Sequence, residues 1–136
     1  MRKKNEYKKI ISTCLFALIL GAPLAQADIY ELRTYTAHEG RLDDLLARFE
    51  NHTLDIFERN GIRSIAYWVP QDGELSENIL IYIIAHPDRE SATANWDAFI
   101  IDPDWLQARE ESRENGALVK EIVSVFMEAV PWSHMP

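Results

Sequence analysis

The order in which apolar periodicity changes along the chain constrains the fold most. Four segments rich in β-branched and aromatic residues read as strands, and segments with apolar residues at helical spacing lie between them. The strands are predicted at 29–36, 62–69, 78–85 and 118–130, and the helices at 40–59 and 88–115. This order, strand, helix, strand, strand, helix, strand, is typical of the ferredoxin-like split βαβ fold. That α+β fold has a four-stranded antiparallel sheet with helices on one face.

Residues with a preference for helix ends support these boundaries. Asn60-Gly61 ends the first helix, and Asp88 is suited to cap the second. Asp102-Pro103 fits a further N-cap followed by proline at the first helical position, so the second helix should stop or bend there. Trp96 lies before this corner and Trp105 after it. We expect both to pack as core at the corner, with contact to a ligand as the alternative.

The first 27 residues have the pattern of a secretory signal peptide. A head with five Lys or Arg residues precedes an apolar run, 10–24, that ends in Leu24-Ala25-Gln26-Ala27. The run is short for a membrane span, which needs ~20 apolar residues. We therefore expect cleavage after Ala27 and export of a single domain, 28–136, to the periplasm or the medium. An uncleaved membrane anchor is the alternative.

The charge and cysteine content of this domain exclude several function classes. Nine basic residues face 21 acidic ones, a net charge of −12, which repels phosphate backbones and anionic lipid. We expect no nucleic-acid partner and, after cleavage, no membrane partner. The chain's one cysteine, Cys14, leaves with the signal peptide, so the domain has no disulfide, thiol nucleophile or Cys-based metal site. Its histidines lack the spacing of ligands on a metal-binding helix, and we expect no metal and no cofactor.

A sheet covered by helices on one face only leaves its other face bare. That face is expected to carry Trp68 or Tyr67 with apolar residues of the third and last strands. Large apolar patches mark interaction sites. Two sheets packed face to face would cover them and enclose a central cavity. The sequence therefore predicts a homodimer built as an α+β barrel.

A series of short motifs runs along the domain: YELRTYT at 30–36, Gly40-x-Leu42 followed by Phe49, Gly61 followed by Tyr67-Trp68, the strand with Tyr82, Arg89 with Trp96-x-x-Phe99, and Asp102-Pro103-Asp104-Trp105. Taken in this order, over nearly the whole domain, they resemble the NIPSNAP family. The resemblance implies the dimeric α+β barrel superfamily, which includes cofactor-independent quinone-type monooxygenases and haem-degrading enzymes. It supplies no catalytic motif for this branch. The tail, 131–136, departs from the Tyr-Ser-Pro-like ending of the family.

Four residues are candidates for chemistry. Glu31 and Arg33 share a strand face with Tyr35, where Arg33 could orient an anionic or carbonyl oxygen and Glu31 could move a proton. The alternative is an ion pair that neutralises itself. His52 and His86 could act as general bases or haem ligands, and the alternative for each is a structural hydrogen bond.

The strand aromatics suggest a ligand site. Tyr35, Tyr67, Trp68 and Tyr82 are expected to surround one cavity, whose composition suits a flat hydrophobic ligand or an ordinary dimer interface. The leading hypothesis is an exported homodimer that binds a small hydrophobic ligand or a partner protein. One alternative is a cofactor-independent monooxygenase-like enzyme acting on an aromatic or quinol substrate, and a second is haem binding.

Overall fold

The computed structural model describes residues 28–134. The predicted signal peptide and its cleavage site after Ala27 lie outside the described residues. Within residues 28–134, no helix combines the length and the apolar character needed to cross a membrane.

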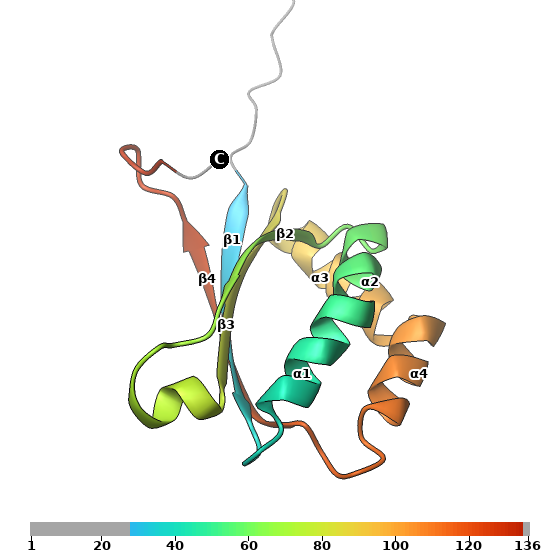
Figure 1. Ribbon diagram of the computed structural model, residues 1–136. Helices are drawn as coiled ribbons and strands as arrows, with labels where there is room; N and C mark the ends of the chain where they lie inside the picture. Colours follow the sequence, from blue (N-terminus) through green and yellow to red (C-terminus); the bar gives the residue numbers. More distant parts are fainter. Residues whose placement is uncertain (1–27, 135–136) are drawn as a thin grey trace, which may run out of the picture.

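The described chain forms one sheet covered by helices on one side (Figure 1). The strands are β1 (Ile29–Ala37), β2 (Arg63–Trp68), β3 (Ile79–His86) and β4 (Val119–Glu128). The first helical segment runs through α1 (Leu42–Arg48), the π-helical turn η1 (Phe49–Thr53) and α2 (Leu54–Arg59). The second comprises α3 (Arg89–Ile100) and α4 (Pro103–Glu111). A 3₁₀ turn that the sequence did not predict, η2 (Gly73–Glu77), joins β2 to β3.

The sheet confirms the predicted topology. Its strand order is β2-β3-β1-β4, and every neighbouring pair is antiparallel. The fold is therefore the ferredoxin-like split βαβ, the protomer fold of dimeric α+β barrels. β3 lies inside the sheet, as its apolar residues on both faces predicted.

The predicted helix ends are also found. Asp88 caps α3 by accepting a hydrogen bond from the Ser91 backbone N–H at 2.6 Å. Asp102 caps α4 by accepting from the Asp104 backbone N–H at 3.0 Å, and Pro103 is the first residue of that helix. Asp102 also forms an ion pair with Arg59 of α2. These contacts fix the corner between α3 and α4 against the first helical segment. α4 ends at Glu111, four residues earlier than predicted.

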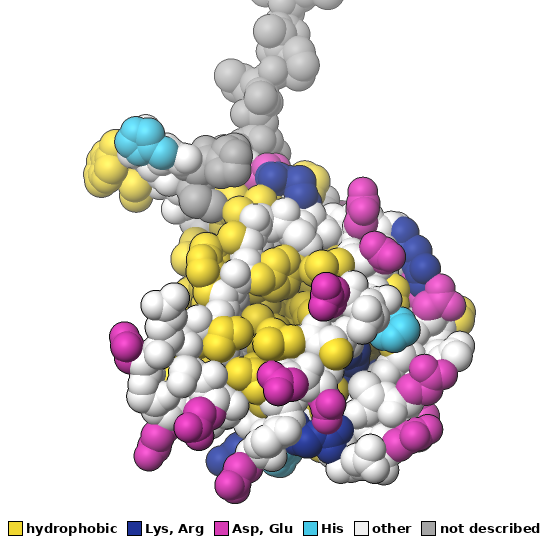
Figure 2. Space-filling model, viewed as in Figure 1, with side chains coloured by type: hydrophobic (Ala, Val, Ile, Leu, Met, Phe, Trp, Pro, Cys, Tyr) yellow, Lys and Arg dark blue, Asp and Glu magenta, His cyan; other side chains and the backbone are white. Residues whose placement is uncertain are grey.

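An aromatic core fills the space between the sheet and the helices. Phe57 of α2 lies at its centre, with its ring centroid 4.9 Å from that of Phe99 and 5.5 Å from that of Trp96. On the surface seen from the β2 edge of the sheet, hydrophobic side chains gather in one area with acidic side chains around it (Figure 2).

The expected placement of the strand aromatics is wrong in part. Tyr35, Tyr67 and Tyr82 do not lie on the bare face of the sheet. They point beneath the helices, where Tyr67 stacks on Tyr82 at 5.2 Å between ring centroids. Tyr67, Tyr82 and Arg33 are register partners on adjacent strands, and register partners share a face. Trp68, one residue later than Tyr67, lies on the opposite face and is 49% exposed.

Candidate functional site

A buried carboxylate, Glu31, is the centre of a polar cluster between the sheet and α3. Glu31 lies near the start of β1 and is 1% exposed. Its Oε1 accepts hydrogen bonds from Arg33 Nη1 and Ser124 Oγ, both at 2.6 Å. Its Oε2 accepts from Trp96 Nε1 at 2.8 Å and lies 3.3 Å from His86 Nε2. A carboxylate has about four lone-pair sites, so this one is fully occupied.

These contacts keep Glu31 ionised. Burial by itself would raise the pKa of Glu31. The hydrogen bonds from its neighbours, above all His86, together with the charge of Arg33, outweigh burial and lower the pKa to about 2. A group with so low a pKa holds no proton to donate at neutral pH and is a weak base. The cluster therefore favours the structural reading of Glu31 and Arg33 over a role in proton transfer.

Arg33 extends the cluster along β1. Its Nη2 donates to the Tyr35 hydroxyl at 3.3 Å, and its guanidinium carbon lies 4.2 Å from the centre of the Trp96 ring. Burial opposes the charge on Arg33, but the tyrosines beside it and Glu31 raise its pKa above the ordinary value. The side chain is therefore a fixed cation, held between a carboxylate and an indole.

His86 closes the cluster at the end of β3. The residue is 1% exposed, and its Nδ1 lies 3.5 Å from the Asn95 amide nitrogen. In the neutral ring, an amide donating to Nδ1 places the ring proton on Nε2, from where it is donated to Glu31. Both ring nitrogens thus face protein partners, which favours the structural alternative for His86.

The low pKa of Glu31 has a measurable consequence. The pKa of Glu31 is about 2 in the folded protein and 4.5 is its ordinary value, so the ionised side chain stabilises the fold above that value. This contribution is lost as the pH falls from about 4.5 towards 2. We expect the free energy of unfolding, measured with urea across this range, to fall less steeply in Glu31→Gln than in the wild type. An equally steep pH dependence of stability in the two proteins would contradict the low pKa of Glu31.

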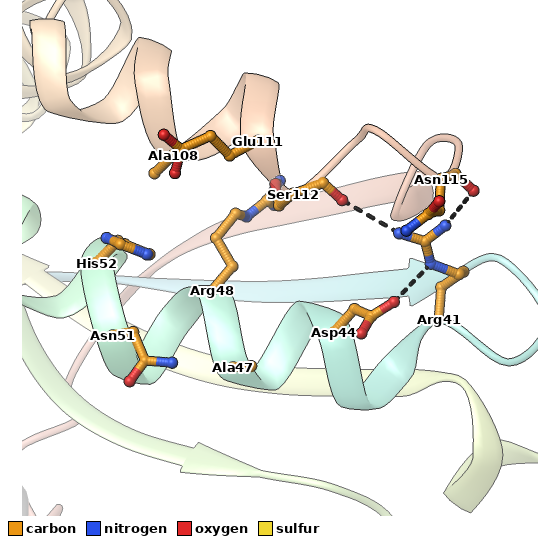
Figure 3. Close-up of a pocket in the computed structure, with 10 residues that line it drawn as sticks. All are labelled: Arg41, Asp44, Ala47, Arg48, Asn51, His52, Ala108, Glu111, Ser112 and Asn115. Atoms are coloured by element: carbon orange, nitrogen blue, oxygen red, sulfur yellow. Dashed lines mark hydrogen bonds and ion pairs between the residues drawn. The ribbon is translucent and has the colours of Figure 1, made fainter.

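His52 is not part of this cluster. It is exposed on η1 and faces a cavity of about 300 Å³ between the first helical segment and α4 (Figure 3). In that cavity Arg41 pairs with Asp44 at 2.9 Å and donates to the backbone carbonyls of Ser112 and Asn115. These contacts tie the end of α4 to the start of α1. Of the four candidate residues, the structure thus brings together Glu31, Arg33 and His86, and Trp96 joins them.

Two residues of interest were missed by the sequence analysis. Ser124 looked like an interruption in the apolar run of β4, yet its hydroxyl is a close partner of Glu31. Arg48 looked like a charged residue on an apolar helix, yet it is only 7% exposed. A charged residue flanked by the buried positions Leu45 and Phe49 was the signal that could have identified Arg48.

Solved structures share this fold at low sequence identity. A NIPSNAP family protein of unknown function from Agrobacterium tumefaciens superposes with a TM-score of 0.70 and is 20% identical, covering 82% of this chain and 96% of its own. An uncharacterized NIPSNAP-like domain protein from Burkholderia xenovorans gives 0.69 and 17%, covering 82% and 93%. SnoaB, a cofactor-independent oxygenase from Streptomyces nogalater, gives 0.50 and 13%, covering 76% and 94%.

The family assignment rests on sequence. Among curated proteins, none matches this chain. The family model NIPSNAP matches residues 30–134, which include the Glu31 cluster and all four strands apart from Ile29. The chain therefore belongs to the NIPSNAP family.

Proposed function

We propose that the protein is an exported homodimer in which two sheets pack face to face and each protomer binds a small, mostly apolar molecule. The observation that carries the proposal is the uncovered apolar face of the sheet. Export is supported by the basic head and apolar run of residues 1–27. Neither dimerisation nor binding of such a molecule requires a metal or a catalytic residue.

The uncovered face is continuous across all four strands. Register partners on the side away from the helices form two uncharged, mostly apolar rows: Trp68, Ile81, Thr34 and Val123, followed by Ala66, Ile83, Leu32 and Val125. Val123 and Val125 are each 47% exposed. The β2–β3 connection with η2 also projects on this side of the sheet (Figure 1). Exposed apolar area of this kind costs free energy in water, roughly 25 cal/mol per Å².

The lack of charged residues in the middle of this face permits a second copy to occupy it. Domains with a net charge of −12 repel one another, so two copies associate stably only through a surface with few charges. The two central rows contain none. Sheets that pack in this way lie about 10 Å apart, with their side chains interdigitated. The interior of such a dimer is then mostly filled by side chains.

Space for a ligand lies instead on the side of the sheet that the helices cover. A mostly apolar cavity of about 270 Å³ lies beside β4 and the end of α4. The described contacts give less support to the alternatives. Glu31 is saturated by hydrogen-bond donors, which does not favour a monooxygenase-like role. Both ring nitrogens of His86 are engaged, which does not favour haem ligation.

The dimer is tested by light scattering coupled to size-exclusion chromatography. We expect the wild-type domain to elute as a dimer at micromolar concentration and Val125→Asp to elute as a monomer, because the charge would be buried between two apolar sheets. Ile101→Asp is the matched control. Ile101 is 70% exposed at the end of α3, and this variant should remain dimeric. A monomeric wild type, or equal behaviour of the two variants, contradicts the proposal.

A further inference from the structure

The geometry points to a small organic acid as the ligand, with its carboxylate held by Arg48, Arg109 and Arg113 and its apolar body beside Trp105 and Ile122. This inference rests on the proposed ligand binding and names its chemistry. The five side chains line the cavity beside β4, together with Tyr35. They come from α1, α4, the turn after α4, and β4.

Arg48 is the reason to expect an anion. It is 7% exposed, and no described carboxylate pairs with it. Its Nη1 donates to Ser112 Oγ at 3.3 Å, and its Nε has no partner among the described residues. Buried arginines are nearly always paired. The guanidinium of Arg48 therefore lacks an anionic partner that an occupied cavity would supply.

The residues around Arg48 make an anionic partner still more favourable. Burial lowers the pKa of Arg48, and the charges of Arg113 and Arg109 lower it further. Arg109, in α4, and Arg113, in the turn after it, line the same cavity, whereas Glu110, Glu111 and Glu114 do not. Arg48 lines both this cavity and the one beside His52, where Asp44 and Glu111 also lie. Only the cavity beside β4 adds Arg109 and Arg113 and has no carboxylate in its lining.

The other residues that line the cavity indicate what kind of molecule carries the carboxylate. The Arg48 guanidinium carbon lies 4.9 Å from the centre of the Trp105 ring. Ile122 points from β4 to the same side and is 47% exposed. A guanidinium fork matches a carboxylate, and flanking apolar side chains suit an aromatic or aliphatic body. The cavity, about 270 Å³, lies at the small end of ligand pockets.

Calorimetry with matched acid and amide probes tests the inference. 2-Naphthoate and 2-naphthamide share a ring system and differ in charge, and octanoate and octanamide provide an aliphatic pair. We expect wild type to bind at least one acid about tenfold or more tightly than its amide, the effect of a hydrogen bond to a charged group. Arg48→Gln should abolish this preference. Arg63→Gln, which removes an exposed arginine on β2, is the matched control and should retain it.

Each outcome has a distinct meaning. Equal affinity for acids and amides overturns the charge assignment and leaves small-molecule binding intact. If neither the acids nor the amides bind, both the charge assignment and the proposed small-molecule binding are overturned. Inorganic phosphate that displaces the acid at equal concentration shows that the apolar body contributes nothing, which also contradicts the inference. If Arg48→Gln unfolds, the double variant Arg109→Gln/Arg113→Gln replaces it, because both side chains are exposed. Retention of the full preference in that variant overturns the assignment.

Discussion

Glu31→Ala is expected to lower the free energy of unfolding by about 3–5 kcal/mol, the cost of removing one partner from a buried ion pair. The substitution leaves the Arg33 guanidinium, the Trp96 indole N–H and the Ser124 hydroxyl without their acceptor. The unpaired donors that are shielded from water add a desolvation cost, whereas Ser124 is exposed and can bond to water. Urea unfolding of both proteins at one protein concentration measures the loss, since the stability of a dimer depends on concentration.

Two further variants make this test specific. Glu31→Gln keeps the shape of the side chain and one acceptor oxygen, so its loss should be intermediate. Glu58→Ala removes an exposed carboxylate from α2 and should change stability by no more than about 0.5 kcal/mol. A loss in Glu31→Ala no larger than that of Glu58→Ala would show that the cluster does not stabilise the fold.

The second large effect is expected at the centre of the aromatic core. Phe57→Ala should cost about 3–5 kcal/mol, because a fully buried ring is lost and a cavity remains. Phe57 is 1% exposed and contacts the rings of Phe49, Trp96 and Phe99. The substitution therefore loosens α3, which carries Trp96 over Glu31. Denaturant unfolding followed by tryptophan fluorescence reports both the stability and the tryptophan environment.

Controls separate a core effect from a general one. Phe57→Leu preserves most of the buried volume and should cost less than about 1.5 kcal/mol. Ile101→Ala removes apolar atoms from a side chain that is 70% exposed, and should leave stability nearly unchanged. A Phe57→Ala protein as stable as Ile101→Ala would place Phe57 outside the core.

The fold was predictable because local signals and long-range packing agree. The change from strand to helix periodicity gave the element order, and Asp88, Asp102 and Pro103 marked the ends of α3 and α4. These signals act within a few residues, so they are readable from sequence. The turn η2 was not predicted, since the segment that precedes β3 carries turn residues without a helical period.

The site was predictable only in part. Strand alternation correctly placed Glu31, Arg33 and Tyr35 on one face of β1. It could not say which face the helices cover, because that depends on the register with Tyr82 and on the position of Trp96. A carboxylate with four partners from three strands and a helix can be buried, and no local pattern reveals those partners.

The burial of Arg48 was not predicted from the sequence, for a different reason. The π-helical turn η1 begins directly after Arg48. A π turn is wider than an α-helical turn and shifts the buried side of the helix relative to a regular period. Arg48 and Phe49 are both buried, and Thr53 donates to the Arg48 carbonyl at 3.2 Å. Position 48 lies three residues after the buried Leu45, so the helical period is compatible with its burial, but the charge of an arginine argues against it.

The two groups of polar residues differ in what they leave unsatisfied. In the Glu31 cluster the carboxylate has all its partners, so the cluster explains stability. At the cavity beside β4, Arg48 lacks a carboxylate partner among the described residues, so that cavity is where binding is expected. Neither group lies on the uncovered face of the sheet, which leaves that face free to contact another protomer.

The accessibility of that face in the unmodified protein tests the dimer most directly. A soluble gadolinium chelate broadens the NMR signals of exposed methyl groups and spares covered ones. In the isolated protomer Val123 and Val125 are each 47% exposed and Ile101 is 70% exposed. We expect the methyl signals of Val123 and Val125 to stay sharp while those of Ile101 broaden. Broadening of all three in proportion to their exposure in the protomer would contradict the dimer.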